Sequence, residues 1–184
     1  DEISAQNQIV EVPGACNSFH DQDLERSRPL LEQADIVLFQ HEINEDAQDK
    51  LITMAHEMGK MVIVNPAPAR PIRDNILAMV DLITPNETEA MVLTGVQVVD
   101  EASAAQAAKV FLDKGVKNVV ITMGAMGAFA TDGVKSELVP RLSVNAIDTT
   151  GAGDAFNGGL ATAIAEGLPM ETALQFATCT AALS

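Results

Sequence analysis

The chain has 184 residues, 47% of them hydrophobic and 20% charged, a composition that excludes an intrinsically disordered protein. Its 26 acidic residues outnumber 11 Lys and Arg, and the formal net charge of −15 argues against a nucleic-acid-binding surface. No apolar run approaches the roughly 18–20 residues that a membrane helix needs, so we expect no membrane partner and no nucleic-acid partner. Cys16 and Cys179 lack metal-ligand spacing, and we expect them to be reduced thiols of a cytoplasmic protein.

Up to residue 124 the chain alternates short apolar runs with helical patterns. Several runs are almost continuously apolar, as in strands that are buried on both faces of a parallel sheet. Asp21 and Asn44 are candidate helix N-caps, and Gly59, Gly95 and Gly115 are candidate helix ends. This alternation predicts a doubly wound α/β layer. We expect strands at 8–12, 35–40, 61–66, 81–86 and 118–124, and helices at 21–34, 44–60, 86–95 and 100–115.

The pattern changes after residue 127. Alternating short strands around Asp132-Gly133 predict a β-hairpin in or beside the sheet. A long helix over 154–167, ended by Gly167 and Pro169, precedes a further helix that runs to the end of the chain. No repeat or interdomain linker is recognisable, so we expect residues 1–184 to form a single α/β domain.

A glycine-rich turn, DTTGAGD at 148–154, lies just before the start of the long helix. The backbone N–H groups of Gly151, Ala152 and Gly153 can form an anion-binding nest, supported by the positive end of the helix. The dinucleotide fingerprint GxGxxG fails here because Phe156 takes the place of its third glycine. The Walker pattern fails because no Gly-Lys-Ser/Thr is present. The turn therefore predicts a phosphate site of another kind.

Asp154 is an unusual residue for a phosphate site, because its carboxylate repels a permanently bound anion. It suits a nest that holds a phosphoryl group in transfer, where a carboxylate accepts the proton of the attacking hydroxyl. The alternative is that Asp154 only caps the helix and that the glycines only form a tight turn. From these residues alone both interpretations stay open.

Several stretches together closely resemble the ribokinase-like (phosphofructokinase-B type) carbohydrate kinases. They stand in that family's order: VPGACNSF (12–19), NPAPAR (65–70), ITPNETEA (83–90), ITMGAMGAF (121–129) and DTTGAGDAF (148–156). The resemblance implies a three-layer α/β/α sandwich with a mostly parallel central sheet. It also implies transfer of the ATP γ-phosphate to a sugar hydroxymethyl group. The NPAPAR and TPNETE stretches favour D-ribose as the sugar.

The resemblance also implies roles for the residues around the phosphoryl group. Asp154 matches the catalytic base, and Gly151, Ala152 and Gly153 match the backbone anion hole. Asn86 and Glu89 match a motif that organises Mg²⁺ and phosphate through water, which suits a cation that takes few direct protein ligands. Without the resemblance, the acids after Asn86 indicate only a helix N-terminus.

The same comparison implies the remaining binding residues. Glu42 matches an acidic residue that binds sugar hydroxyls, although an exposed acid after a strand is otherwise a solvated surface residue. Asp148 and Thr150 match part of a K⁺ site. The nucleotide-contacting residues are expected to be Thr122, Gly124, Ala125, Met126, Gly127, Gly153 and Thr178, with Met126 standing where family members often carry a charged residue.

The family's N-terminal half, with its sugar-binding Gly-Gly motif and β lid, does not precede Asp1 in the sequence. We therefore expect residues 1–184 to be the C-terminal, nucleotide-binding and catalytic part of a longer kinase, homodimeric at full length. The partners would be ATP and a small sugar, with Mg²⁺ and K⁺ as cofactors. Two alternatives remain: another kinase of the family, such as a fructokinase or nucleoside kinase, and a catalytically silent nucleotide-binding module.

Overall fold

The computed structural model describes residues 12–142, 144 and 149–184. A six-stranded sheet in the order β1-β2-β3-β4-β5-β6 forms its centre. The first four strands are parallel, and the last two are antiparallel to their neighbours. The strands are β1 (Ile36–Phe39), β2 (Met61–Val64), β3 (Leu82–Ile83), β4 (Asn118–Thr122), β5 (Ala128–Thr131) and β6 (Ser136–Val139).

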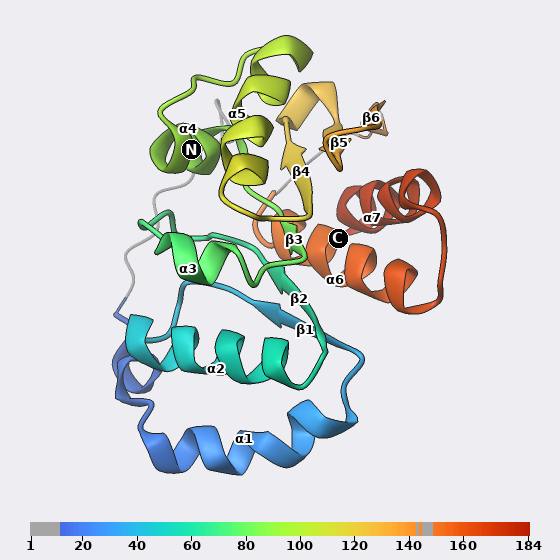
Figure 1. Cartoon of the computed structure of the whole chain (residues 1–184). Coiled ribbons are helices and arrows are strands. Elements are labelled where there is room, and N and C mark those ends of the chain that lie inside the picture. The colour runs from blue at the N-terminus through green and yellow to red at the C-terminus, as the bar shows by residue number, and fades with distance from the viewer. Residues whose placement is uncertain (1–11, 143, 145–148) are drawn as a thin grey trace.

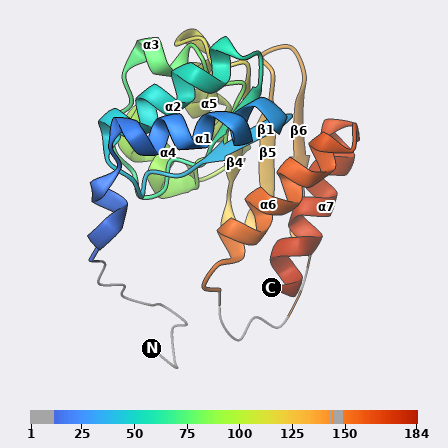
Figure 2. The same cartoon turned by 90° about the horizontal axis from the view of Figure 1, so that it is seen from below.

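Helices cover both faces of this sheet. They are α1 (Asp21–Gln33), α2 (Glu45–Glu57), α3 (Asp74–Leu77), α4 (Glu87–Thr94), α5 (Glu101–Asp113), α6 (Ala152–Ala165) and α7 (Met170–Leu183), with 3₁₀ turns η1 (Gly14–Ser18) and η2 (Gly124–Met126). Helices α1 to α5 gather on one side of the sheet, and α6 and α7 pack together on the other (Figures 1 and 2). The expected three-layer α/β/α architecture is confirmed. No helix in the described part of the chain is long and apolar enough to cross a membrane.

The continuously apolar strands follow from these two helical layers. Val62 and Val64 contribute to the core beneath α1 to α5, whereas Ile63, between them, contributes to the core beneath α6 and α7. Successive side chains of a strand point to opposite faces, so both faces of a covered strand must be apolar. The central strands therefore do not alternate polar with apolar residues.

The parallel strands follow one another in chain order, so their carboxyl ends lie along one edge of the sheet. Each end is followed by a polar or glycine-containing segment: Gln40 after β1, Asn65 after β2, Thr84 after β3 and, one residue beyond β4, η2. Among the described residues, each new strand is added at the same edge of the sheet and the order never turns back. The expected doubly wound arrangement is therefore not seen among them. Ligands of open α/β sheets bind at this edge.

Of the two expected N-caps of the first helices, Asp21 needs correction and Asn44 is confirmed by position. Helix α1 begins at Asp21 and His20 is its N-cap, because the Asp23 carboxylate accepts a hydrogen bond from the His20 N–H at 3.0 Å. The Asp21 carboxylate instead pairs with Lys50. Asn44 is the N-cap of α2 by position, but its side chain bonds the backbone of Phe19 rather than its own helix. The strand expected at 8–12 lies almost wholly outside the described residues, whereas the hairpin around Asp132-Gly133 is confirmed as β5–β6.

Candidate active site

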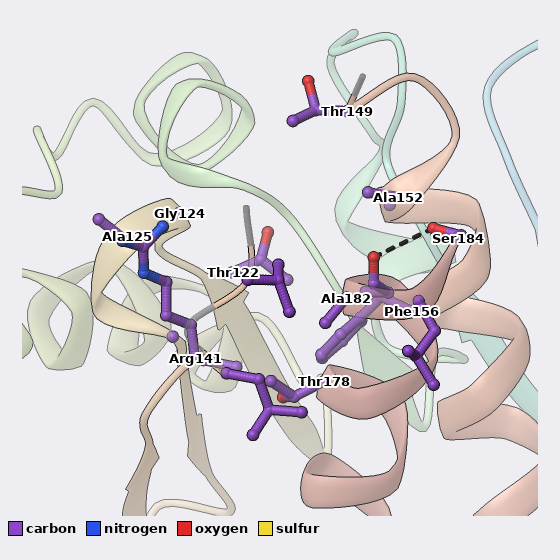
Figure 3. Close-up of a pocket in the computed structure, with 17 residues that line it drawn as sticks. Thr122, Gly124, Ala125, Arg141, Thr149, Ala152, Phe156, Thr178, Ala182 and Ser184 are labelled. Carbon is purple, nitrogen blue, oxygen red and sulfur yellow. Dashed lines mark hydrogen bonds between the residues drawn. The ribbon is translucent and has the colours of Figure 1, made fainter. Parts of the chain in front are cut away.

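A cavity of about 700 Å³ opens at the carboxyl edge of the sheet. Figure 3 shows its walls: η2 and the segment after β6 on one side, the start of α6 and the last turns of α7 on the other. Most of the lining side chains are apolar or absent, as in most small-molecule pockets. Seven residues predicted from the sequence meet in it: Thr122, Gly124, Ala125, Gly127, Ala152, Gly153 and Thr178.

The η2 turn that forms one wall depends on Gly127. This residue has φ of 103°, which L side chains rarely adopt, and a Cβ built on it would lie 2.0 Å from the carbonyl oxygen of Val139. Only glycine lets the turn pack directly against the end of β6. The backbone of the turn is thereby held against the segment that continues along the cavity.

Thr178 and Arg141 each bring to the cavity a polar side chain that has no partner among the described residues. The Thr178 hydroxyl is buried without a hydrogen bond. Arg141, which we did not predict, is the only Lys or Arg among the described residues that line the cavity, and its guanidinium makes no described ion pair. In Figure 3 its side chain extends along the wall in the direction of Gly124. Unpaired polar groups in a cavity are suited to a ligand that supplies their partners.

The first turn of α6 closes the cavity at its other end. Gly151 is the N-cap with φ of 80°, and a Cβ at Gly151 or Gly153 would meet no atom within 4 Å. The Ala152 N–H donates to the Thr149 carbonyl at 3.2 Å, whereas the Gly153 N–H has no acceptor in the described part of the chain. An open surface beside the positive end of a 14-residue helix can accept an anion.

Asp154 lies in this turn but does not line the cavity. Its side chain is exposed, and its Oδ1 accepts a hydrogen bond from Gln40 Nε2 at 2.5 Å. Gln40 directly follows β1 and was not predicted from the sequence. Glu42 lies two residues further along and is exposed. The predicted base and the predicted sugar-binding acid thus flank the same strand end, outside the cavity.

A buried chain of hydrogen bonds supports the first turn of α6 from beneath. Asn157 Nδ2 donates to the Gly153 carbonyl at 2.9 Å, and Asn157 Oδ1 accepts from the Thr84 hydroxyl at 2.6 Å. Asn65 Nδ2 in turn donates to the Thr84 carbonyl at 3.0 Å. The ends of β2 and β3 and the start of α6 are therefore joined by side chains whose polar groups satisfy one another.

Asn86 and Glu89 form a capping box at the start of α4. The carboxylate of Glu89 accepts from the backbone N–H and from the side-chain amide of Asn86 at 2.8 and 2.9 Å, and Asn86 Oδ1 accepts from the Glu89 N–H at 2.9 Å. Burial raises the pKa of Glu89, partly offset by these hydrogen bonds. The helix-cap interpretation is therefore confirmed, and each carboxylate oxygen keeps a lone pair for a water.

A second acid lies near this helix start. Glu87 Oε1 is 3.4 Å from the position that a Cβ of Gly124 would take, beside η2. Acid and amide oxygens next to η2 form a donor set that suits a hydrated Mg²⁺. No group of three or more His, Cys, Asp or Glu in the described ranges can hold a metal directly.

The remaining predicted residues are Met126, Asp148 and Thr150. Met126 is 38% exposed and does not line the cavity. Asp148 lies outside the described residues, so the structure does not describe half of the expected K⁺ pair. Thr150 directly precedes the Gly151 cap of α6.

Comparison with known proteins gives the arrangement its context. A model of the pfkB family of carbohydrate kinases matches residues 2–184. The chain belongs to the pfkB family. This pfkB chain is 42% identical to a ribokinase of Haemophilus influenzae over 181 residues, covering 98% of the chain and 59% of that protein. It is 33% identical to a deoxyribokinase of Salmonella typhi over 182 residues, 98% of the chain and 60% of that protein.

The comparison with solved structures agrees with these sequence comparisons. The structure of Arabidopsis thaliana ribokinase complexed with ribose and ATP has a TM-score of 0.87 and 32% sequence identity, and the match covers 97% of the pfkB chain and 58% of that chain. The chain thus spans about three fifths of the length of the curated relatives it matches. The family resemblance seen in the motifs is confirmed.

Proposed function

We propose that the protein containing this chain transfers the γ-phosphate of ATP to the hydroxymethyl group of D-ribose. The observation that carries the proposal is the single turn at the start of α6. On one side it lines an apolar cavity, and on the other it presents Asp154 at the end of β1. A phosphoryl group held at this turn would lie between a nucleotide and an acceptor hydroxyl. Residues 1–184 then form the nucleotide-binding and phosphoryl-transfer part of the kinase.

In this proposal the adenine lies against the apolar wall near Thr178, and the phosphates run along η2 toward α6. The N–H groups of the first turn of α6, Gly153 among them, stabilise the charge on the transferring phosphoryl oxygens, as does the positive end of the helix. Asp154 accepts the proton of the ribose hydroxymethyl as its oxygen attacks in line.

Cations complete the proposed site. Asn86 and Glu89 would hold Mg²⁺ through water, and Mg²⁺ supplies positive charge to the β- and γ-phosphates when bound. K⁺ at Asp148 and Thr150, sugar binding by Glu42, a cytoplasmic location and a homodimer stay predictions. Light scattering of the full-length gene product tests the dimer.

The sugar is tested by measuring ATP consumption by the full-length gene product with D-ribose, 2-deoxy-D-ribose, D-fructose and adenosine. We expect the highest kcat/KM with D-ribose, because four relatives named ribokinase are 37–42% identical to the chain, whereas the deoxyribokinases are 33% identical and a fifth relative named ribokinase is 30% identical. A higher kcat/KM with any other acceptor would overturn the assignment to ribose. ATP binding without turnover on any acceptor would favour the silent nucleotide-binding module.

A further inference from the structure

The one described side-chain hydrogen bond of Asp154 comes from Gln40, a residue far away in the sequence. Gln40 and Asp154 are separated by 114 residues, yet the carboxamide donates to the carboxylate at 2.5 Å. Asp154 itself is exposed and projects from the first turn of a helix, where few neighbours restrict its rotamer. Without Gln40, nothing among the described residues would fix the direction of its second oxygen.

Gln40 is itself held in place on both sides. The Phe39 carbonyl accepts from the Asn65 N–H at 2.8 Å, and the His41 N–H donates to the Ala67 carbonyl at 2.8 Å. Phe39 and His41 are both buried, so the backbone at Gln40 is anchored to the segment that follows β2. The side chain therefore starts from a fixed point at the carboxyl end of β1.

The chemistry of the donor matters as much as its position. A lysine or arginine there would pair with the carboxylate and weaken it as a proton acceptor. A carboxamide is neutral, occupies one of about four lone-pair positions and leaves Oδ2 free. It thus orients a base without adding charge beside it.

We propose that Gln40 is a positioning residue for Asp154, holding Oδ1 so that Oδ2 faces the hydroxyl of the acceptor. This inference rests on the function proposed above. In group transfer, a small misalignment of a catalytic group costs turnover rather than binding. Loss of Gln40 should accordingly lower kcat while leaving the KM for ATP unchanged.

The test compares Gln40→Ala and Gln40→Glu in the full-length gene product. We expect kcat to fall about tenfold in Gln40→Ala, the typical loss for one hydrogen bond to a charged group. In Gln40→Glu the fall should be larger, about a hundredfold, because an isosteric carboxylate repels the base instead of holding it. The matched control is Gln33→Glu, the same charge change at an exposed residue of α1, which should leave kcat unchanged. Equal kcat in wild type and Gln40→Glu would overturn the proposal.

Crystal structures of wild type and Gln40→Ala provide a readout that needs no activity. We expect Asp154 in one rotamer in the wild type and in several in the variant. A single unchanged rotamer in Gln40→Ala would refute positioning by Gln40, whatever the enzyme does. The outcome differs if the wild-type protein phosphorylates no sugar and Asp154 still changes from one rotamer in wild type to several in Gln40→Ala. That result would refute the proposed function alone.

Discussion

The two sides of the first turn of α6 are built on opposite principles. On the cavity side two polar side chains are unpaired: the Thr178 hydroxyl and the Arg141 guanidinium have no partner among the described residues. On the side of β1 the important polar group is already paired, because Gln40 holds Asp154. Unpaired groups are suited to a ligand that supplies their hydrogen bonds. Paired groups fix a geometry before any ligand arrives.

The largest expected effect tests whether the two sides work separately. We expect Asp154→Asn to lower kcat about a thousandfold, because an amide cannot accept the proton of the acceptor hydroxyl. The affinity for ATP should stay within about twofold, since Asp154 does not line the cavity. Steady-state kinetics and calorimetric titration of ATP check both values. A variant that loses ATP binding together with turnover would show that the two sides form a single unit.

As the pH falls, the segment after β1 should lose stability before the cavity does. Burial, with the nearby charge of Arg70, lowers the pKa of His41 to about 4, from an ordinary value of 6.5. The unfolded chain therefore binds the proton more readily, and the stability that the neutral imidazole contributes is present above pH 6.5 and lost as pH falls toward 4. The shift corresponds to about 3 kcal/mol of unfolding free energy.

Urea unfolding at several pH values measures this loss. We expect the free energy of unfolding to fall less steeply with acid in His41→Gln than in wild type. His56→Gln, at an exposed position of α2, should retain the wild-type slope. Hydrogen exchange should then quicken first around residues 40–42. Identical slopes in His41→Gln and wild type would contradict the assignment.

The buried hydrogen bonds beneath the first turn of α6 join the cavity side of that turn to the β1 side. Breaking them should give the next largest effect. We expect Asn157→Leu to lower the unfolding free energy by about 2 kcal/mol, since it leaves the Thr84 hydroxyl without its close partner. Thr84→Val with Asn157→Leu should cost less than the sum of the two single changes, because both partners of the bond are then apolar. A thermodynamic double-mutant cycle measures the difference. Additive costs would mean that the two side chains do not depend on each other.

Much of the fold could be predicted because its signals are local. The buried parallel strands appear as continuous apolar runs, and Gly95 ends α4 at φ of 76° as expected. The start of α1 at residue 21 was predicted, but its N-cap was misassigned because Asp21 and Asp23 are both acids of the right kind. Only the spacing to the His20 N–H decides which of them completes the cap.

The candidate site was predictable to the extent that it lies in short motifs. The turns at η2 and α6 belong to contiguous stretches, and their residues do meet in one cavity. Gln40 and Asn157 carried no such signal. A neutral amide after a strand has no characteristic spacing, and its importance depends on a partner 114 residues away that only the folded chain brings near.

The smallest predicted effect tests the cavity side alone. The phosphates of ATP carry several negative charges to a chain with a net charge of −15, and Arg141 is the only Lys or Arg in the described part of the cavity wall. We expect Arg141→Gln to weaken ATP binding about fivefold (~1 kcal/mol), an effect that high salt should reduce. Affinity for adenosine, which has no phosphate, should not change. Calorimetric titration with both ligands at low and high ionic strength measures this.

Lys135 offers the matched control, because it lies at the opposite end of β6, is exposed and makes no described ion pair. Lys135→Gln removes the same charge from the same hairpin and should leave ATP binding as in wild type. If both variants weaken ATP binding equally, only the net charge matters and Arg141 makes no direct contact. If Arg141→Gln weakens adenosine as much as ATP, the guanidinium contacts the base instead of the phosphates. A loss confined to ATP and to Arg141 would mean that the unpaired cation of the cavity marks the path of the phosphates toward α6.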